Sequence, residues 1–142
     1  MLMPNFKNTA IAAAACTALA LPVFAETVNY TADLTAGAEV PPNDSSATGT
    51  ADVTVDTEAK TVSWTVTVEG LTGDPVAAHI HGPAEEGENA GPVINMSDAI
   101  MEGSGDITED QISELDDGKY YVNIHTEQNP NGEIRGQLSK AE

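Results

Sequence analysis

The sequence is poor in cysteine, aromatic residues and cations. Its 142 residues include one Cys, 4% aromatic side chains, and five Lys and Arg against 23 Asp and Glu, which gives a formal net charge of -18. A disulfide scaffold is excluded because a single cysteine has no partner within the chain. Nucleic acid and anionic lipid surfaces are not expected as partners, because both attract clustered Lys and Arg. The length suits one domain, whose core must consist mainly of small and β-branched side chains.

The N-terminus has the pattern of a secretory signal peptide. One lysine precedes an uncharged apolar run, Ala10–Leu21, and Val23 and Ala25 occupy the small-residue positions of a cleavage site. We therefore expect a signal peptide over residues 1–25 and a mature domain over residues 26–142.

Two other interpretations of this segment exist. A membrane anchor needs an apolar run of roughly 20 residues, which is longer than the run found here. Lipidation at Cys16 is the second, but the residues before it are alanines and the apolar run continues beyond it. A cleaved signal predicts an exported protein, periplasmic or extracellular, with no membrane contact after cleavage and no cysteine left for disulfides.

The mature chain has the two-residue alternation of β-strands. The clearest case is Thr61–Glu69, where Val62, Trp64, Val66 and Val68 alternate with polar residues. The other expected strands are Val28–Ala36, Ala47–Asp56, Val76–His81, Pro92–Met96, Lys119–Thr126 and Gly132–Ser139. Short strands separated by turn residues predict an all-β domain, an antiparallel Greek-key β-sandwich.

One short segment has the pattern of a helix. Thr108 and Gln111 form a capping box, and Asp117-Gly118 supplies a stop signal. We expect one helix over Glu109–Asp116.

The three histidines are the chemically informative residues. His79 and His81 share the strand face opposite Ile80, about 7 Å apart along the strand. His125 lies on the face opposite Ile124 by the same alternation. If the two strands are neighbours, three imidazoles converge and form a metal site with one position open for water or substrate. The alternative is three ordinary surface histidines.

Arg135, the only Arg in the chain, is expected beside these histidines. Its segment forms a hairpin with the strand of His125, and pairing Ile124 with Ile134 keeps both in the core. Arg135 then faces the His125 side, opposite Asn123. Its guanidinium could receive a small anion at the open metal position, or form a salt bridge with one of the many carboxylates.

Four ordered blocks of the chain resemble the CHRD (chordin-type) domain family. The blocks are Leu34–Pro42, Ala78–Ala84, Tyr121–Thr126 and Pro130–Leu138. The resemblance spans nearly the whole mature chain and implies an exported all-β module over residues 26–142.

A looser resemblance concerns the chemistry. The pair His79 and His81 on one strand, a late third His and a late Arg are similar to the copper side of Cu,Zn superoxide dismutases, which are also antiparallel β-sandwiches. The chain departs from that family in having no fourth His, no His in the Gly82–Gly91 loop and no cysteine pair. The resemblance therefore implies a copper-only superoxide dismutase, with His79, His81 and His125 as ligands and Arg135 as a guide for the small anionic substrate, superoxide.

Two alternatives come from other functional classes. Three histidines on neighbouring strands also hold zinc in hydratases and hydrolases, so zinc is the second choice of metal. A non-enzymatic copper-binding or adhesion module is the other alternative. In that case Met96 and Met101 would serve as extra soft ligands, although both are expected in the core because isoleucines flank them.

Overall fold

The computed structural model describes residues 13–22 and 25–142. Residues 13–22 are exposed and form neither helix nor strand. The predicted charged start of the signal peptide with Lys7, the first residues of its apolar run and Val23 of the predicted cleavage site lie outside the described residues. No helix in the described ranges is long and apolar enough to cross a membrane.

The folded part of the chain consists almost entirely of strands. Its elements are β1 (Thr27–Thr35), η1 (Ala36–Ala38), β2 (Thr48–Asp56), β3 (Thr61–Glu69), β4 (Pro75–His81), β5 (Pro92–Asn95), β6 (Glu102–Asp106), α1 (Glu109–Asp116), β7 (Tyr121–Thr126), β8 (Ile134–Gln137) and β9 (Ser139–Lys140). The strands pair antiparallel in the order β5-β4-β7-β8-β1-β2-β3-β6, and β9 pairs with β1. This is one continuous sheet.

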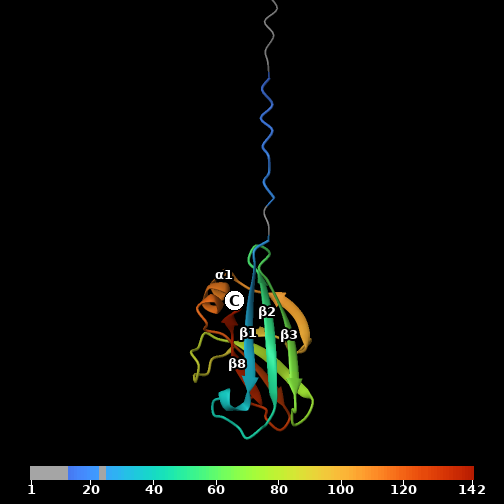
Figure 1. Ribbon diagram of the computed structural model, residues 1–142, viewed down its shortest axis with the longest axis vertical. Coiled ribbons are helices and arrows are strands. Elements are labelled where there is room, and N and C mark those ends of the chain that lie inside the picture. Colours follow the sequence, from blue (N-terminus) through green and yellow to red (C-terminus); the bar gives the residue numbers. More distant parts are fainter. Residues whose placement is uncertain (1–12, 23–24) are drawn as a thin grey trace, which may run out of the picture.

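The sheet combines hairpins with connections between distant strands. β1, β2 and β3 follow one another as hairpins, but β4 pairs with β7, β8 with β1 and β3 with β6, so the chain crosses between distant strands. Figure 1 shows β1, β2 and β3 in one layer with further strands behind them. The predicted all-β, antiparallel fold with one short helix is confirmed, and both layers belong to a single sheet that curves around the core.

A single hydrophobic core fills the space between the layers. On β3, Val62, Trp64 and Val66 are buried, as the alternation predicted. The indole N–H of Trp64 donates to the carbonyl of Ala99 at 2.8 Å, which satisfies the polar atom of this large side chain. Helix α1 has the predicted bounds and the predicted capping box between Thr108 and Gln111.

The sequence analysis missed one strand, β6, merged β8 and β9 into the single predicted strand Gly132–Ser139, and misplaced one side chain. β6 has no apolar alternation because it is an edge strand that pairs only with β3, and its Gly103 lies under the ring of Trp64, where a Cβ atom would come within 2.6 Å of the indole. Met96 is fully buried, as predicted. The prediction that Met101 belongs to the core is wrong: it lies directly before the edge strand and is 38% exposed.

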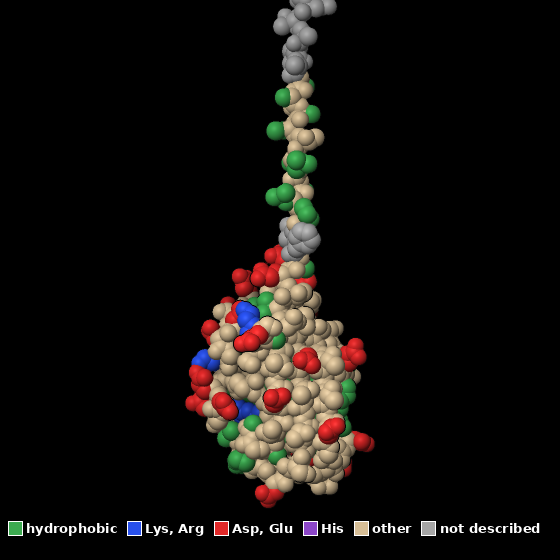
Figure 2. Space-filling model, in the orientation of Figure 1, with side chains coloured by type: hydrophobic (Ala, Val, Ile, Leu, Met, Phe, Trp, Pro, Cys, Tyr) green, Lys and Arg blue, Asp and Glu red, His purple; other side chains and the backbone are tan. Residues whose placement is uncertain are grey.

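The surface of the domain is acidic. Within residues 25–142 each lysine lies against a carboxylate: Lys60 contacts Glu109, Lys119 contacts Glu85 and Lys140 contacts Asp116. Figure 2 shows carboxylates scattered over the visible face and few cations among them. The lysines are thus largely neutralised locally, which leaves a field that repels anions.

A buried carboxylate joins three loops at one end of the sheet. Glu133 is completely buried and accepts hydrogen bonds from the hydroxyls of Ser45, Thr72 and Thr126 and from the backbone N–H of Thr72, at 2.6–2.9 Å. Burial by itself would raise the pKa of Glu133, but these hydrogen bonds outweigh it and lower the pKa to about 2. Glu133 therefore holds its charge inside the protein and fixes the loops around it.

Glu133→Gln is expected to lower the free energy of unfolding at pH 7 by about 2–3 kcal/mol, because the amide cannot accept all four hydrogen bonds. The stabilising contribution of Glu133 is present above pH 4.5, the ordinary pKa of its carboxyl, and is lost as the pH falls toward about 2. Urea unfolding at several pH values measures both effects, with exposed Glu127→Gln as the control. An equal effect of the two substitutions would contradict this role.

Candidate metal centre

The antiparallel pairing of β4 with β7 places the three histidines on one face of the sheet. In this register His79 pairs with Asn123, His81 with Tyr121, and Ala77 with His125. Ala78 and Ile80 of β4 and Val122 and Ile124 of β7, which alternate with the histidines, are buried in the core. The predicted common face of the histidines is therefore confirmed, and the two strands are direct neighbours.

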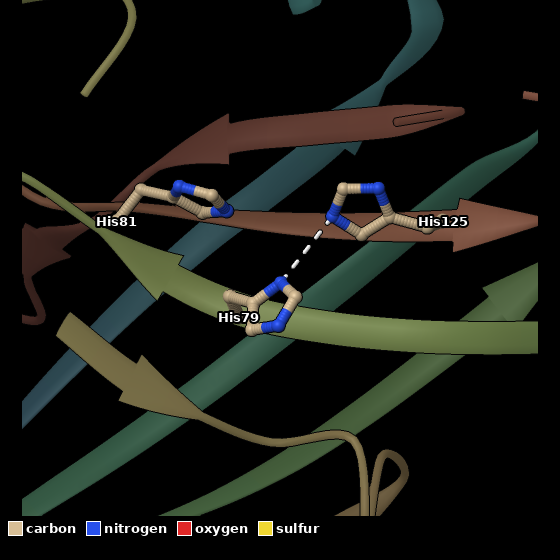
Figure 3. A group of neighbouring side chains, drawn as sticks. All are labelled: His79, His81 and His125. Carbon is tan, nitrogen blue, oxygen red and sulfur yellow. Dashed lines mark hydrogen bonds between the residues drawn. The ribbon is translucent and has the colours of Figure 1, made fainter. Parts of the chain in front are cut away.

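The three imidazoles form a compact cluster. One ring nitrogen from each lies within 4.8 Å of the others, and His79 Nδ1 is 3.4 Å from His125 Nε2. Figure 3 shows His79 and His81 on one strand and His125 on the next, with their rings grouped together. This spacing allows all three to approach a single metal ion with small side-chain adjustments.

Backbone carbonyls fix the protonation of two of these rings. His81 Nδ1 is 2.9 Å from the carbonyl oxygen of Ala90, and His125 Nδ1 is 2.9 Å from that of Pro130. A carbonyl oxygen only accepts, so both Nδ1 atoms carry a proton, and in the neutral ring Nε2 is then the nitrogen with the lone pair. Among the described residues His81 Nε2 is buried with no hydrogen-bond partner. A buried, unpartnered imidazole lone pair whose other nitrogen is held by a carbonyl is the arrangement of a metal ligand.

The surroundings favour the uncharged form of His79 and His81. Burial is the main cause that lowers the pKa of both His79 and His81. For His81 the hydrogen bond to Ala90 opposes this shift, and the charges of the other histidines and of Arg135 add to it. Neutral imidazole is the form that binds metals.

The register of the β7–β8 hairpin agrees with the sequence analysis. Arg135 pairs with Asn123 and Ile134 pairs with Ile124, so Arg135 lies on the face that carries the histidines. Among the described residues the ion pairs are those of the three lysines, and Arg135 forms none within 4 Å. Its position is thus as predicted, without the alternative salt bridge.

Arg135 is packed against the site through Tyr121. The Tyr121 ring is parallel to that of His81, with centroids 5.0 Å apart, and the guanidinium carbon of Arg135 lies 3.5 Å from the centre of the Tyr121 ring. Arg135 is 2% exposed and donates to the side chain of Asn89 and the carbonyl of Glu88. The guanidinium therefore contributes charge near the histidines from a buried, fixed position.

These contacts also hold the loop between β4 and β5. The backbone N–H of Ala90 donates to the hydroxyl of Tyr121, and that hydroxyl donates to the carbonyl of Ala90, both at 3.1 Å. The side chain of Asn89 donates to the carbonyl of Val40 at 2.9 Å. Tyr121 and Arg135 thus position the carbonyl that orients His81. The sequence analysis missed Tyr121, although the alternation Tyr121, Asn123, His125 puts it on the same face.

A second missed residue is Glu39, which lies in a cavity beside the histidines. This cavity, of about 350 Å³, is lined by His81, Tyr121, Asn123 and Glu39 among others. Glu39 is 6% exposed and accepts a hydrogen bond from the amide of Asn123. Burial raises the pKa of Glu39 to about 7, although the charge of Arg135 and the hydrogen bond from Asn123 act in the opposite direction.

Glycine is required where the next loop passes this pair. Gly132 has φ +123, and a Cβ atom there would lie 2.6 Å from a carboxylate oxygen of Glu39. A side chain at position 132 would therefore disturb both Glu39 and Asn123.

Comparison with known proteins identifies the family of this chain. The model of the CHRD domain matches residues 30–138, a range that contains the three histidines, Glu39 and Arg135. Chordin of Danio rerio is 31% identical over 109 residues, in an alignment that covers 69% of this chain and 12% of chordin. The chain therefore spans only a small part of that relative's length, and no solved structure matches it significantly. These matches and the all-β fold show that the chain belongs to the CHRD domain family.

Proposed function

We propose that this protein is an exported copper-binding CHRD domain protein that dismutes superoxide at the site formed by His79, His81 and His125. The observation that carries the proposal is the convergence of three imidazole nitrogens within 4.8 Å, with the tautomers of His81 and His125 fixed by backbone carbonyls. Ordinary surface histidines have no need of this support.

The chemistry of the donor set favours copper. Imidazole nitrogens suit both copper and zinc, and for a given site Cu(II) binds more tightly than Zn(II). Copper would supply one-electron redox chemistry, which the dismutation of two superoxide ions to dioxygen and hydrogen peroxide requires. The protein would contribute three ligands, leave one coordination position open, and provide the adjoining cavity for a small ligand.

In this proposal Arg135 attracts the anionic substrate. The acidic surface repels an anionic substrate, and the guanidinium supplies a positive charge that acts on His81 itself. Because Arg135 is buried and already donates to Asn89 and Glu88, it guides the anion by its field and also positions the loop of Ala90.

The first prediction concerns the metal. The untagged protein is expected to bind one copper per chain and to show nitrogen hyperfine structure in Cu(II) paramagnetic resonance. The triple variant His79→Ala, His81→Ala, His125→Ala has no histidine left and should lose both. Met101→Leu, which removes the exposed methionine, is the control and should bind copper normally.

Two other outcomes of this measurement would each indicate another function. Stoichiometric zinc with no affinity for copper would replace the dismutase by a zinc hydratase or hydrolase. Absence of metal from both proteins would overturn the proposal and leave a binding or adhesion module.

The second prediction separates the charge of Arg135 from its hydrogen bonds. In the copper-loaded protein Arg135→Gln should lower the rate constant for superoxide about tenfold, because it removes the local positive charge. Added salt should leave the wild-type rate unchanged or raise it, since salt screens the repulsion by the acidic surface.

Arg135→Lys keeps the charge and loses the two-pronged contact with Glu88 and Asn89. Full activity in this variant would assign the effect to charge, and a loss equal to that of Arg135→Gln would assign it to the loop. Lys119→Gln, which removes a partly exposed cation, is the control. A steep fall of the wild-type rate with salt would contradict the electrostatic argument.

A further inference from the structure

Two glutamates are buried in this domain, and the fold treats them in opposite ways. Glu133 receives four hydrogen bonds and stays charged. Glu39 receives one side-chain hydrogen bond, from Asn123, and forms no ion pair within 4 Å among the described residues. The fold therefore supports an anion at Glu133 and provides poorly for one at Glu39.

Glu39 lies beside the candidate metal centre. Its side chain lines the cavity that also reaches His81, and the cavity has room for several water molecules at roughly 30 Å³ each. The ionisable groups that face Glu39 are Arg135, whose charge acts on it, and His81 and Tyr121 in the cavity wall. None of them is a carboxylate, so nothing nearby competes with Glu39 as a proton-carrying acid.

We propose that Glu39, held by Asn123, is a proton-donating group in the cavity beside the three histidines and serves the reduction of superoxide there; this rests on the proposed dismutase function. A carboxyl group that is neutral near pH 7 can give up its proton in the physiological range, which makes it an effective general acid. Burying a carboxyl group that can become charged destabilises the fold. A glutamine of the same shape would remain neutral at every pH and would avoid this destabilisation.

The proton balance shows where Glu39 acts. In the reductive half of dismutation, one superoxide, one electron and two protons give one hydrogen peroxide, and the electron comes from the oxidation of another superoxide to dioxygen. Glu39 supplies one proton: its O–H bond breaks, an O–H bond forms on the reduced oxygen species, and the carboxylate keeps the hydrogen bond from Asn123. Solvent supplies the second proton and, through the cavity, returns the first to Glu39.

The experiment compares Glu39→Gln and Glu39→Asp with the wild-type protein. In the metal-free proteins, infrared titration should show the carbonyl band of a neutral carboxylic acid that disappears as the pH rises through about 7, in the wild type and not in Glu39→Gln. In the copper-loaded proteins, Glu39→Gln should lower superoxide turnover about 100-fold at acidic pH with copper content unchanged, as expected for loss of a general acid.

The pH profile distinguishes proton donation from a structural role. Wild-type turnover should fall as Glu39 loses its proton, whereas turnover of Glu39→Gln should stay low and flat. Glu39→Asp keeps a carboxyl group and should recover part of the rate and of the pH dependence. Exposed Glu127→Gln is the control and should match the wild type in both measurements.

Three results would overturn the proposal. If copper-loaded Glu39→Gln had the same turnover and pH profile as the wild type, Glu39 would not be the proton donor, and the dismutase function would still stand. An infrared band that persists unchanged in Glu39→Gln would show that the acid is another residue. A copper-loaded wild-type protein without superoxide turnover would overturn the proposed function and this inference together.

Discussion

The register between β4 and β7 is the constraint on which the site depends. Pairing His79 with Asn123 and His81 with Tyr121 places every polar site residue of these strands on one face and their apolar neighbours in the core. A shift of one residue would turn the histidines of one strand into the core and expose its isoleucine. The hydrophobic effect that fixes the core thus also fixes the position of the imidazoles.

The sequence alone predicts the parts of this protein that follow from alternation. The strands, the helix Glu109–Asp116, the common face of the histidines and the place of Arg135 opposite Asn123 all result from local periods and hairpin pairing. β6 was missed because an edge strand that covers Trp64 with glycines needs no apolar residues of its own.

The loop residues of the site were not identified from the sequence. The carbonyls of Ala90 and Pro130 and the carboxyl group of Glu39 reach the histidine face from three different loops. Backbone carbonyls leave no signature in a sequence, because every residue has one. The pattern of Glu39 next to Val40 and two prolines likewise gives no sign that its side chain is buried.

The alternation of β4 and β7 also has a consequence for how such domains diversify. Positions that determine folding and positions that determine chemistry follow one another along the same strands, yet they face opposite sides of the sheet. The three histidines are only partly buried, so substitutions at these positions leave the core side chains in place, and a descendant could keep the architecture while it loses the histidines. The core residues determine whether a chain has this fold, and the residues of the histidine face determine whether it has the site. The site therefore has to be checked separately in each member of the family.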